Sequence, residues 1–265
     1  MRYTLSALLT IIMILSVVPA YSHRGDNVNI RIISDSGGEF LTIPFKDNWE
    51  GTTHVIKNYL EAKREENYKI VVKNNSGERI GLVIAVDGRN IINGEKSFLR
   101  NSERMYIIRP FSTTELDGWR TNLDSVHRFY FTDEDDSYTA RTFGDSSAMG
   151  VIAVAVFREK KRQRVFHDNQ KSEEEASRAP SAPSAEAKLK DSSGKRAGTG
   201  FGKEKFSPAM RVEFESEEVP FKKLLVKYEW RNVLCTKAIL KCEKEKNRLW
   251  DNDDFAPYPP GYSGR

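Results

Sequence analysis

Short runs of alternating apolar and polar residues dominate the chain up to residue 157. Residues 28–32 (Val-Asn-Ile-Arg-Ile), 68–73 and 79–86 place apolar side chains on every second position, the pattern of a strand with one buried face. Turn-forming residues separate these runs at residues 34–38 (Ser-Asp-Ser-Gly-Gly) and 74–77 (Asn-Asn-Ser-Gly). We therefore expect strands at all three runs, with residues 68–73 and 79–86 paired as an antiparallel hairpin.

Similar runs predict further strands along the chain. Residues 150–157 (Gly-Val-Ile-Ala-Val-Ala-Val-Phe) lack alternation, so this strand should be central and buried on both faces. Residues 55–64 fit a helix with one apolar face, whereas residues 54–60 also fit a strand, and both interpretations remain open. The remaining strands are predicted at residues 39–43 (ending at Pro44), 105–108, 126–131, 137–142, 149–157, 210–214 and 224–230.

Many short strands without interleaved amphipathic helices favour an all-β fold, an antiparallel β-sandwich or jelly roll. The predicted core consists of apolar residues on these strands: Ile80, Leu82, Ile84, Val86, Phe129, Val151, Ile152, Val154 and Val156.

Composition divides the chain into four parts. We expect a signal peptide (residues 1–22), a β-sandwich domain (23–157), a disordered linker rich in charge, Ser, Pro and Ala (158–200), and a C-terminal β segment with a Pro/Gly/Tyr tail (201–265). The linker composition buries too little apolar surface to offset the entropy of the chain. Two C-terminal strands are too few to be stable alone, so they should join an edge of the first domain or form a small satellite.

The N-terminus predicts export. Arg2 precedes an apolar run at residues 5–18, and residues 20–22 (Ala-Tyr-Ser) follow Pro19 as a small-residue cleavage site. The run is shorter than the roughly 20 residues needed to span a bilayer, which favours a cleaved signal over an anchor. We expect a secreted or periplasmic protein with no membrane span after cleavage.

The chain has two cysteines, Cys235 and Cys242. In an oxidising compartment they should form a disulfide bond that closes a short loop. Two thiols without nearby histidine are too few for a tetrahedral zinc site. We therefore predict no metal site and no cofactor.

The net charge of the chain indicates which partners to expect. The 42 basic and 38 acidic residues give a net charge of +4, so the surface is mixed rather than polycationic. This balance argues against nucleic acid as a partner, and export argues against it more strongly.

Several segments of the predicted sandwich form a set: residues 59–62 (Tyr-Leu-Glu-Ala), 79–90, 129–131 (Phe-Tyr-Phe), 137–141 (Ser-Tyr-Thr-Ala-Arg) and 150–156. They resemble a family of exported, β-rich bacterial proteins over roughly residues 55–157, with looser similarity at residues 198–202 and 228–231. That family has no assigned activity. The resemblance implies a compact secreted β domain and carries over no catalytic residue.

One stretch has the composition of a recognition surface. Residues 117–120 (Asp-Gly-Trp-Arg) place an aromatic ring and a guanidinium directly after a turn dipeptide. The alternative is that the tryptophan is a core anchor and the arginine a surface cap. The predicted binding patch, at one end of the sandwich, comprises Arg89, Tyr106, Trp119, Arg120 and Tyr138.

Other motifs point to no specific chemistry. Residues 24–26 (Arg-Gly-Asp) match an adhesion tripeptide that three common residues form by chance. The acidic clusters at residues 133–136 and 251–254 lack the glycine and glutamate spacing of a calcium loop, so they read as solvated turns. The nucleophile elbow, the helical zinc motif and the P-loop are absent from the sequence.

Two function classes follow. The favoured one is an exported, non-catalytic binding or assembly module of the bacterial periplasm or cell surface, with an envelope protein or polysaccharide as its partner. The alternative is an envelope hydrolase, whose acid and base would come from carboxylates in loops at one end of the sandwich. Those carboxylates are Asp87, Asp117, Asp133, Glu134, Asp135 and Asp136.

Overall fold

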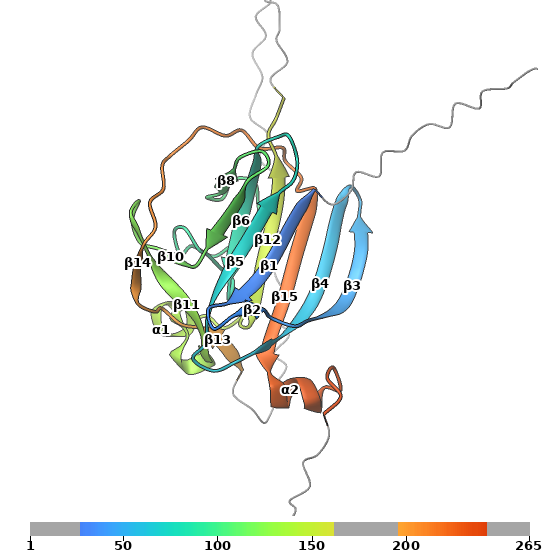
Figure 1. The fold of residues 1–265 in the computed structure, drawn as a ribbon, viewed down its shortest axis with the longest axis vertical. Helices are drawn as coiled ribbons and strands as arrows, with labels where there is room; N and C mark the ends of the chain where they lie inside the picture. The colour runs from blue at the N-terminus through green and yellow to red at the C-terminus, as the bar shows by residue number, and fades with distance from the viewer. Residues whose placement is uncertain (1–26, 162–195, 243–265) are drawn as a thin grey trace, which may run out of the picture.

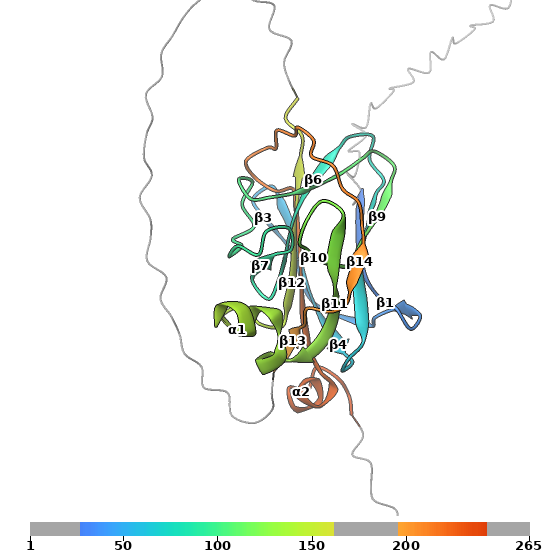
Figure 2. The same ribbon diagram turned by 90° about the vertical axis from the view of Figure 1, so that its left-hand side faces the viewer.

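The computed structural model describes residues 27–161 and 196–242, which form two β-sheets packed face to face (Figure 1). The prediction of an all-β sandwich is confirmed. Figure 2 views the layers from the side, with α1 and α2 at the same end of the sandwich. The short helices are η1 (Glu134–Asp136), α1 (Tyr138–Phe143) and α2 (Arg231–Thr236).

The first sheet has eight strands and follows the order β10-β11-β5-β1-β2, with β13 and β14 on β11 and β9 on β5. Its strands are β1 (Val28–Ser34), β2 (Gly38–Glu39), β5 (Asn67–Asn74), β9 (Thr113–Leu116), β10 (Gly118–Arg120), β11 (Ser125–Asp133), β13 (Ala197–Thr199) and β14 (Glu204–Phe206).

The second sheet has seven strands and follows the order β3-β4-β15-β12-β6-β7, with β8 on β6. Its strands are β3 (Thr42–Glu50), β4 (Thr53–Ala62), β6 (Ile80–Val86), β7 (Arg89–Asn90), β8 (Tyr106–Ile108), β12 (Val151–Arg158) and β15 (Lys222–Trp230).

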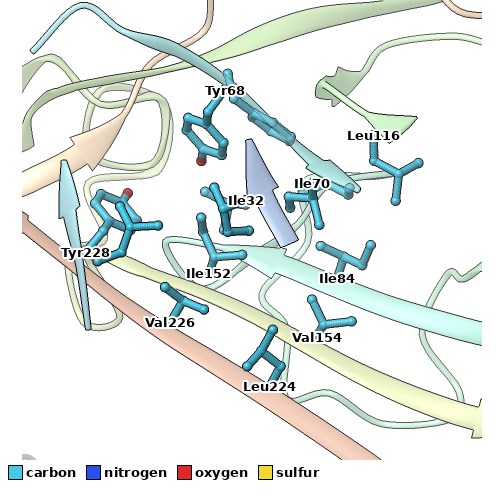
Figure 3. Close-up of a cluster of buried hydrophobic side chains, with 14 of the residues drawn as sticks. Ile32, Tyr68, Ile70, Ile84, Leu116, Ile152, Val154, Leu224, Val226 and Tyr228 are labelled. Atoms are coloured by element: carbon cyan, nitrogen blue, oxygen red, sulfur yellow. The ribbon is translucent and has the colours of Figure 1, made fainter. Parts of the chain in front are cut away.

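The core lies between the sheets and contains the alternate residues that the sequence pattern predicts. Figure 3 shows side chains from both layers, such as Ile32 and Ile70 from the first sheet and Ile84 and Val154 from the second, meeting in this space. Eight of the nine predicted core residues are buried, and Val151 at the start of β12 is half-buried. As predicted, β12 is a central strand between β15 and β6.

The C-terminal strand lies in the middle of the second sheet. We expected residues 224–230 at an edge or in a satellite, but β15 pairs with β12 on one side and runs parallel to β4 on the other (Figure 1). Its alternate residues Leu224, Val226 and Tyr228 enter the shared core. Burying both of its edges satisfies the backbone groups that an isolated strand would leave exposed. The C-terminal segment is therefore part of the sandwich.

The predicted hairpin of residues 68–73 and 79–86 is wrong. β5 pairs with β1, β9 and β11 in the first sheet, whereas β6 pairs with β12, β7 and β8 in the second. The turn between them carries the chain from one layer to the other. Asn74 holds it by donating from Nδ2 to the carbonyl oxygens of Glu78 (2.8 Å) and Arg109 (3.0 Å).

Three other expectations change. Residues 53–62 form strand β4, which decides the open choice at residues 55–64 against a helix. The predicted strand at residues 137–142 is wrong: residues 138–143 form helix α1, because Ser137 accepts from the amide of Ala140 as an N-cap and Gly144 ends the helix at a φ of 62°. Pro44 does not end a strand: it lies in edge strand β3, next to a register shift.

The predicted disulfide between Cys235 and Cys242 is present, with 5.6 Å between the two Cα atoms. Cys235 lies in α2, directly after β15. The predicted signal peptide, residues 24–26 and residues 251–254 lie outside the described residues. So does most of the predicted linker, although its last residues form β13.

The sheet order predicts how the chain behaves when it is cut. A protease site inserted at residue 180 should give two fragments that elute together in gel filtration, because β15 is bonded to both β4 and β12. Separate elution of the C-terminal fragment under native conditions would contradict the interior position of β15.

Core packing predicts a contrast between two apolar side chains. Ile84→Ala should lower the free energy of unfolding by about 2–5 kcal/mol, because the side chain is 1% exposed and its removal leaves a cavity. Leu41→Ala, at a side chain 65% exposed, should change it by less than about 0.5 kcal/mol. Urea denaturation of both variants measures the difference, and equal effects would refute this assignment of the core.

Candidate functional site

A tight turn after β10 begins the candidate site. The Oδ1 atom of Asn122 accepts hydrogen bonds from the amides of Asp124 (2.7 Å) and Ser125 (2.8 Å), which closes the turn between β10 and β11. The carbonyl oxygens of Leu123 and Asp124 each accept a hydrogen bond of 2.7 Å from residues that follow β14. The turn therefore anchors the start of residues 207–216, which we call the strap.

Arg120 joins the strap to the second sheet. Its Nε donates to the hydroxyl of Tyr106 on β8 at 2.7 Å, and its Nη1 donates to the carbonyl of Ser207 at 2.9 Å. Burial raises the pKa of Tyr106, although the nearby Arg120 opposes that rise. The tyrosine is therefore a neutral hydroxyl, and Arg120 is held in place by uncharged partners.

A cleft of about 680 Å³ opens between β8, the turn and the strap. Apolar side chains line part of it, and among them Leu123, Met210 and Val212 are 46%, 73% and 49% exposed. Exposed apolar side chains that gather at a concave surface are characteristic of binding sites. The lining also includes four arginines: Arg104, Arg109, Arg120 and Arg211.

The charge of this cleft is one-sided. Among the described residues that line it, none is an aspartate or a glutamate. Within residues 27–161 and 196–242, the side chains of Arg104, Arg109 and Arg211 form no ion pair. Three exposed guanidinium groups thus add to Arg120 around an apolar surface, and their mutual repulsion is relieved when an anion binds.

Another hollow, beside the disulfide, is also lined by arginines, but these arginines have acidic partners. It is lined by Trp230, Arg64, Arg231 and other residues. Arg64 is already paired with Asp133, and Arg231 with Glu61 at 3.1 Å. The guanidinium groups there are neutralised by the protein itself, so we place the candidate site in the cleft beside the strap.

The structure separates the five residues of the predicted patch. Tyr106 and Arg120 meet and line the cleft. Trp119 is 2% exposed and donates from its indole to the carbonyl of Gly200 at 3.0 Å, as expected of a core anchor. Tyr138, on α1, packs against Trp119 with 4.7 Å between ring centroids. Arg89 pairs with Asp145 at 3.0 Å, away from the lining of the cleft.

Sequence reasoning missed Arg104, Arg109 and Arg211. The available signal was weak: each arginine has an apolar residue within two positions, as in Met210-Arg211-Val212. Roughly a hundred residues separate the two parts of the cleft in sequence, as loop-built sites commonly require. Only the docking of the strap brings these parts together.

The loop carboxylates each have partners of their own. Asp117 is buried and pairs with Lys205, and Asp133 pairs with Arg64. Glu134 accepts two hydrogen bonds from Arg196, at 2.8 and 2.7 Å. Within the described ranges, no group of three or more His, Cys, Asp or Glu side chains is arranged to hold a metal ion.

Asp87 is the most unusual of these carboxylates. It lies in the predicted Asp-Gly turn between β6 and β7, where the φ angles of Asp87 and Gly88 are 49° and 80°. Its Oδ1 accepts from the amide of Gly150 (2.8 Å) and the hydroxyl of Tyr228 (2.6 Å), and its Oδ2 accepts from the amide of Thr199 (2.8 Å). Burial raises the pKa of Asp87 to about 6, although these hydrogen bonds and Lys227 oppose the rise.

Two hydroxyl contacts extend this network through the core. The Thr199 hydroxyl lies 2.7 Å from that of Tyr228 and 2.8 Å from that of Tyr68. Figure 3 shows Tyr68 and Tyr228 entering the core from opposite layers. The network therefore joins β5, β13, β15 and the turn after β6.

These observations define an all-β sandwich with an arginine-lined cleft. Comparisons with protein-family models, with curated proteins and with solved structures found no match to the chain. In residues 27–161 and 196–242, no helix is long and apolar enough to cross a membrane.

The raised pKa of Asp87 predicts a pH effect with a definite sign. The folded state holds this proton up to about pH 6, and the unfolded state releases it near 3.8, so between these values the folded state binds more protons. The free energy of unfolding should therefore fall as the pH rises through this window, by up to about 3 kcal/mol from this group.

Asp87→Asn isolates that contribution. Urea denaturation at pH 4 and pH 7 should show that the variant lacks this fall and is less stable than the native chain at both values. Both carboxylate oxygens of Asp87 accept hydrogen bonds, so the amide NH₂ introduced by the substitution would point at an N–H or O–H donor. A hydrogen bond would be lost there, which lowers stability. Asp124→Asn, at an exposed carboxylate, serves as the control. An unchanged pH dependence in Asp87→Asn would contradict the prediction.

Proposed function

We propose that this protein is an exported, non-catalytic binding or assembly module of the bacterial periplasm or cell surface. Its partner binds in the cleft between β8, the turn after β10 and the strap. The cleft selects a partner that combines negative charge with apolar groups. The observation that carries the proposal is the lining of this cleft by the described residues, with four arginines, exposed apolar side chains and no carboxylate among them.

Physical chemistry favours binding as the role of such a lining. Like charges that share a concave surface repel one another, which destabilises the folded protein unless an anion neutralises them. Arginine also presents several donors to a carboxylate or phosphate while its planar group packs on apolar surface. Residues of this kind dominate the energetics of protein interfaces.

Export is supported by two features. The apolar run at residues 5–18 and the small residues at its end have the composition of a secretory signal. The bond between Cys235 and Cys242 suits an oxidising compartment.

A non-catalytic role is supported by how the carboxylates are used. Asp87, Asp117 and Asp133 contact three separate sets of partners within the fold. Glycoside hydrolysis, by comparison, uses a pair of carboxyl groups that face one substrate. We therefore retain binding as the proposal and propose no hydrolytic reaction.

A polyanion binding assay tests the proposal. Fluorescein-labelled poly-glutamate should bind the mature protein, with an affinity that falls as salt is added. Arg104→Ser with Arg211→Ser should weaken binding at least tenfold, because two of the unpaired guanidinium groups are lost. Fluorescence anisotropy measures both effects.

The matched control is Arg31→Ser with Arg141→Ser. It removes the same charge from β1 and α1, outside the cleft. Equal losses in the two double variants would mean that the net charge of the protein, and not the cleft, attracts the anion. Complete absence of binding to the native protein would also refute the proposal.

A further inference from the structure

The cleft is bordered by backbone as well as by side chains. β8 pairs with β6 along one edge, and no other strand of the described residues pairs with β8. An unpaired strand edge presents a row of N–H and C=O groups that can bond to a further strand.

The strap forms an arch beside this free edge. At one end the amides of Ser207 and Ala209 are bonded to the turn at 2.7 Å, and at the other the carbonyl of Glu215 accepts from Lys160 at 2.7 Å. Phe214 packs over β6, where a β-carbon on Gly81 would lie 2.7 Å from its ring. Between these attachments, residues 210–213 form no backbone hydrogen bond with any described residue.

This geometry overturns one prediction from the sequence. Residues 210–214 alternate like a strand, but they pair with no strand in the described part of the chain. Met210 and Val212 are largely exposed and line the cleft instead of a core. Apolar side chains and unpaired backbone thus meet at the same place.

We propose that the partner is an extended polypeptide segment with acidic side chains, which adds as a strand to the free edge of β8 beneath the strap. This inference rests on the function proposed above and names the chemical class of its partner. Charge complementarity comes from the four arginines of the cleft, whose described lining residues include no aspartate or glutamate. Backbone complementarity comes from the unpaired edge of β8 and from the backbone of residues 210–213, which forms no hydrogen bond with the described residues.

A peptide strand satisfies both demands together. Its side chains alternate between two faces, so acidic residues at alternate positions pair with arginines of the cleft while the residues between them meet apolar groups such as Ile107 and Met210. Its amides and carbonyls bond to β8, as in other cases of strand addition. An acidic polysaccharide offers the charge but has no such row of backbone amides and carbonyls.

Four probes of the native protein test this inference. The first is a pool of nine-residue peptides with Glu or Asp at alternate positions and apolar residues between them. The second and third carry N-methyl groups on the acidic or on the apolar positions, which blocks amide donors along one edge or the other. The fourth is dextran sulfate, a polyanion without amides.

We expect the unmodified pool to bind and at least one methylated pool to bind at least tenfold more weakly. Arg104→Ser with Arg211→Ser should also weaken binding of the unmodified pool tenfold, whereas Arg31→Ser with Arg141→Ser should not. Amide hydrogen exchange at residues 106–108 should slow when the pool binds and stay unchanged with dextran sulfate. Melting temperatures of the variants check that each is folded.

The outcomes separate this inference from the proposed function. Equal binding of dextran sulfate and all three pools, with hydrogen exchange unchanged at residues 106–108, would overturn strand addition while leaving an anion-binding cleft. Binding of dextran sulfate alone would replace the peptide with a polysaccharide. Binding of none of the four would refute both proposals.

Discussion

The buried carboxylate of Asp87 is the constraint on which the arrangement of this sandwich depends. It gathers donors from Gly150, Thr199 and Tyr228, which stand in three segments that are far apart in sequence. A buried carboxylate without such partners costs several kcal/mol, so loss of any one of the three segments should lower the stability of the fold. Together with the pairing of β15 to β4 and β12, this network holds β13 and β15 within the two sheets. Thr199 extends the tie to Tyr68, across the two layers.

The position of the C-terminal strands creates the cleft. β14 pairs with β11 in the first sheet, and β15 lies inside the second, so the chain between them must pass from one layer to the other. The strap makes that passage, and Figure 1 shows it along one side of the sandwich between β14 and β15. Its ends are bonded to the body of the protein, whereas the backbone of residues 210–213 has no partner among the described residues. Because the core holds β15 inside the second sheet, the strap must cross the surface of the sandwich. Its unbonded backbone and the unpaired arginines therefore lie at the same place.

The candidate site was predictable only in part. Aromatic rings and guanidinium groups suit recognition, and the structure places Tyr106 and Arg120 of the predicted patch in the cleft. Trp119, chosen for the same reason, is needed in the core, where its indole bonds to Gly200. That carbonyl belongs to a segment which passes so close to β11 that a side chain at Gly200 would collide with the ring of Tyr130. Sequence pattern cannot distinguish an exposed aromatic residue from a buried one whose partner lies some eighty positions away.

What the sequence determined by itself is local. Alternation of apolar residues predicted most of the strands, the unbroken apolar run predicted central β12, and the spacing of two cysteines predicted their bond, because each depends on residues near one another in the chain. Only the tertiary structure decided which sheet each strand joins and that Arg104 and Arg211 face one cleft. Those outcomes depend on long-range pairing and on partners for buried polar groups. Periodicity carries no information about either.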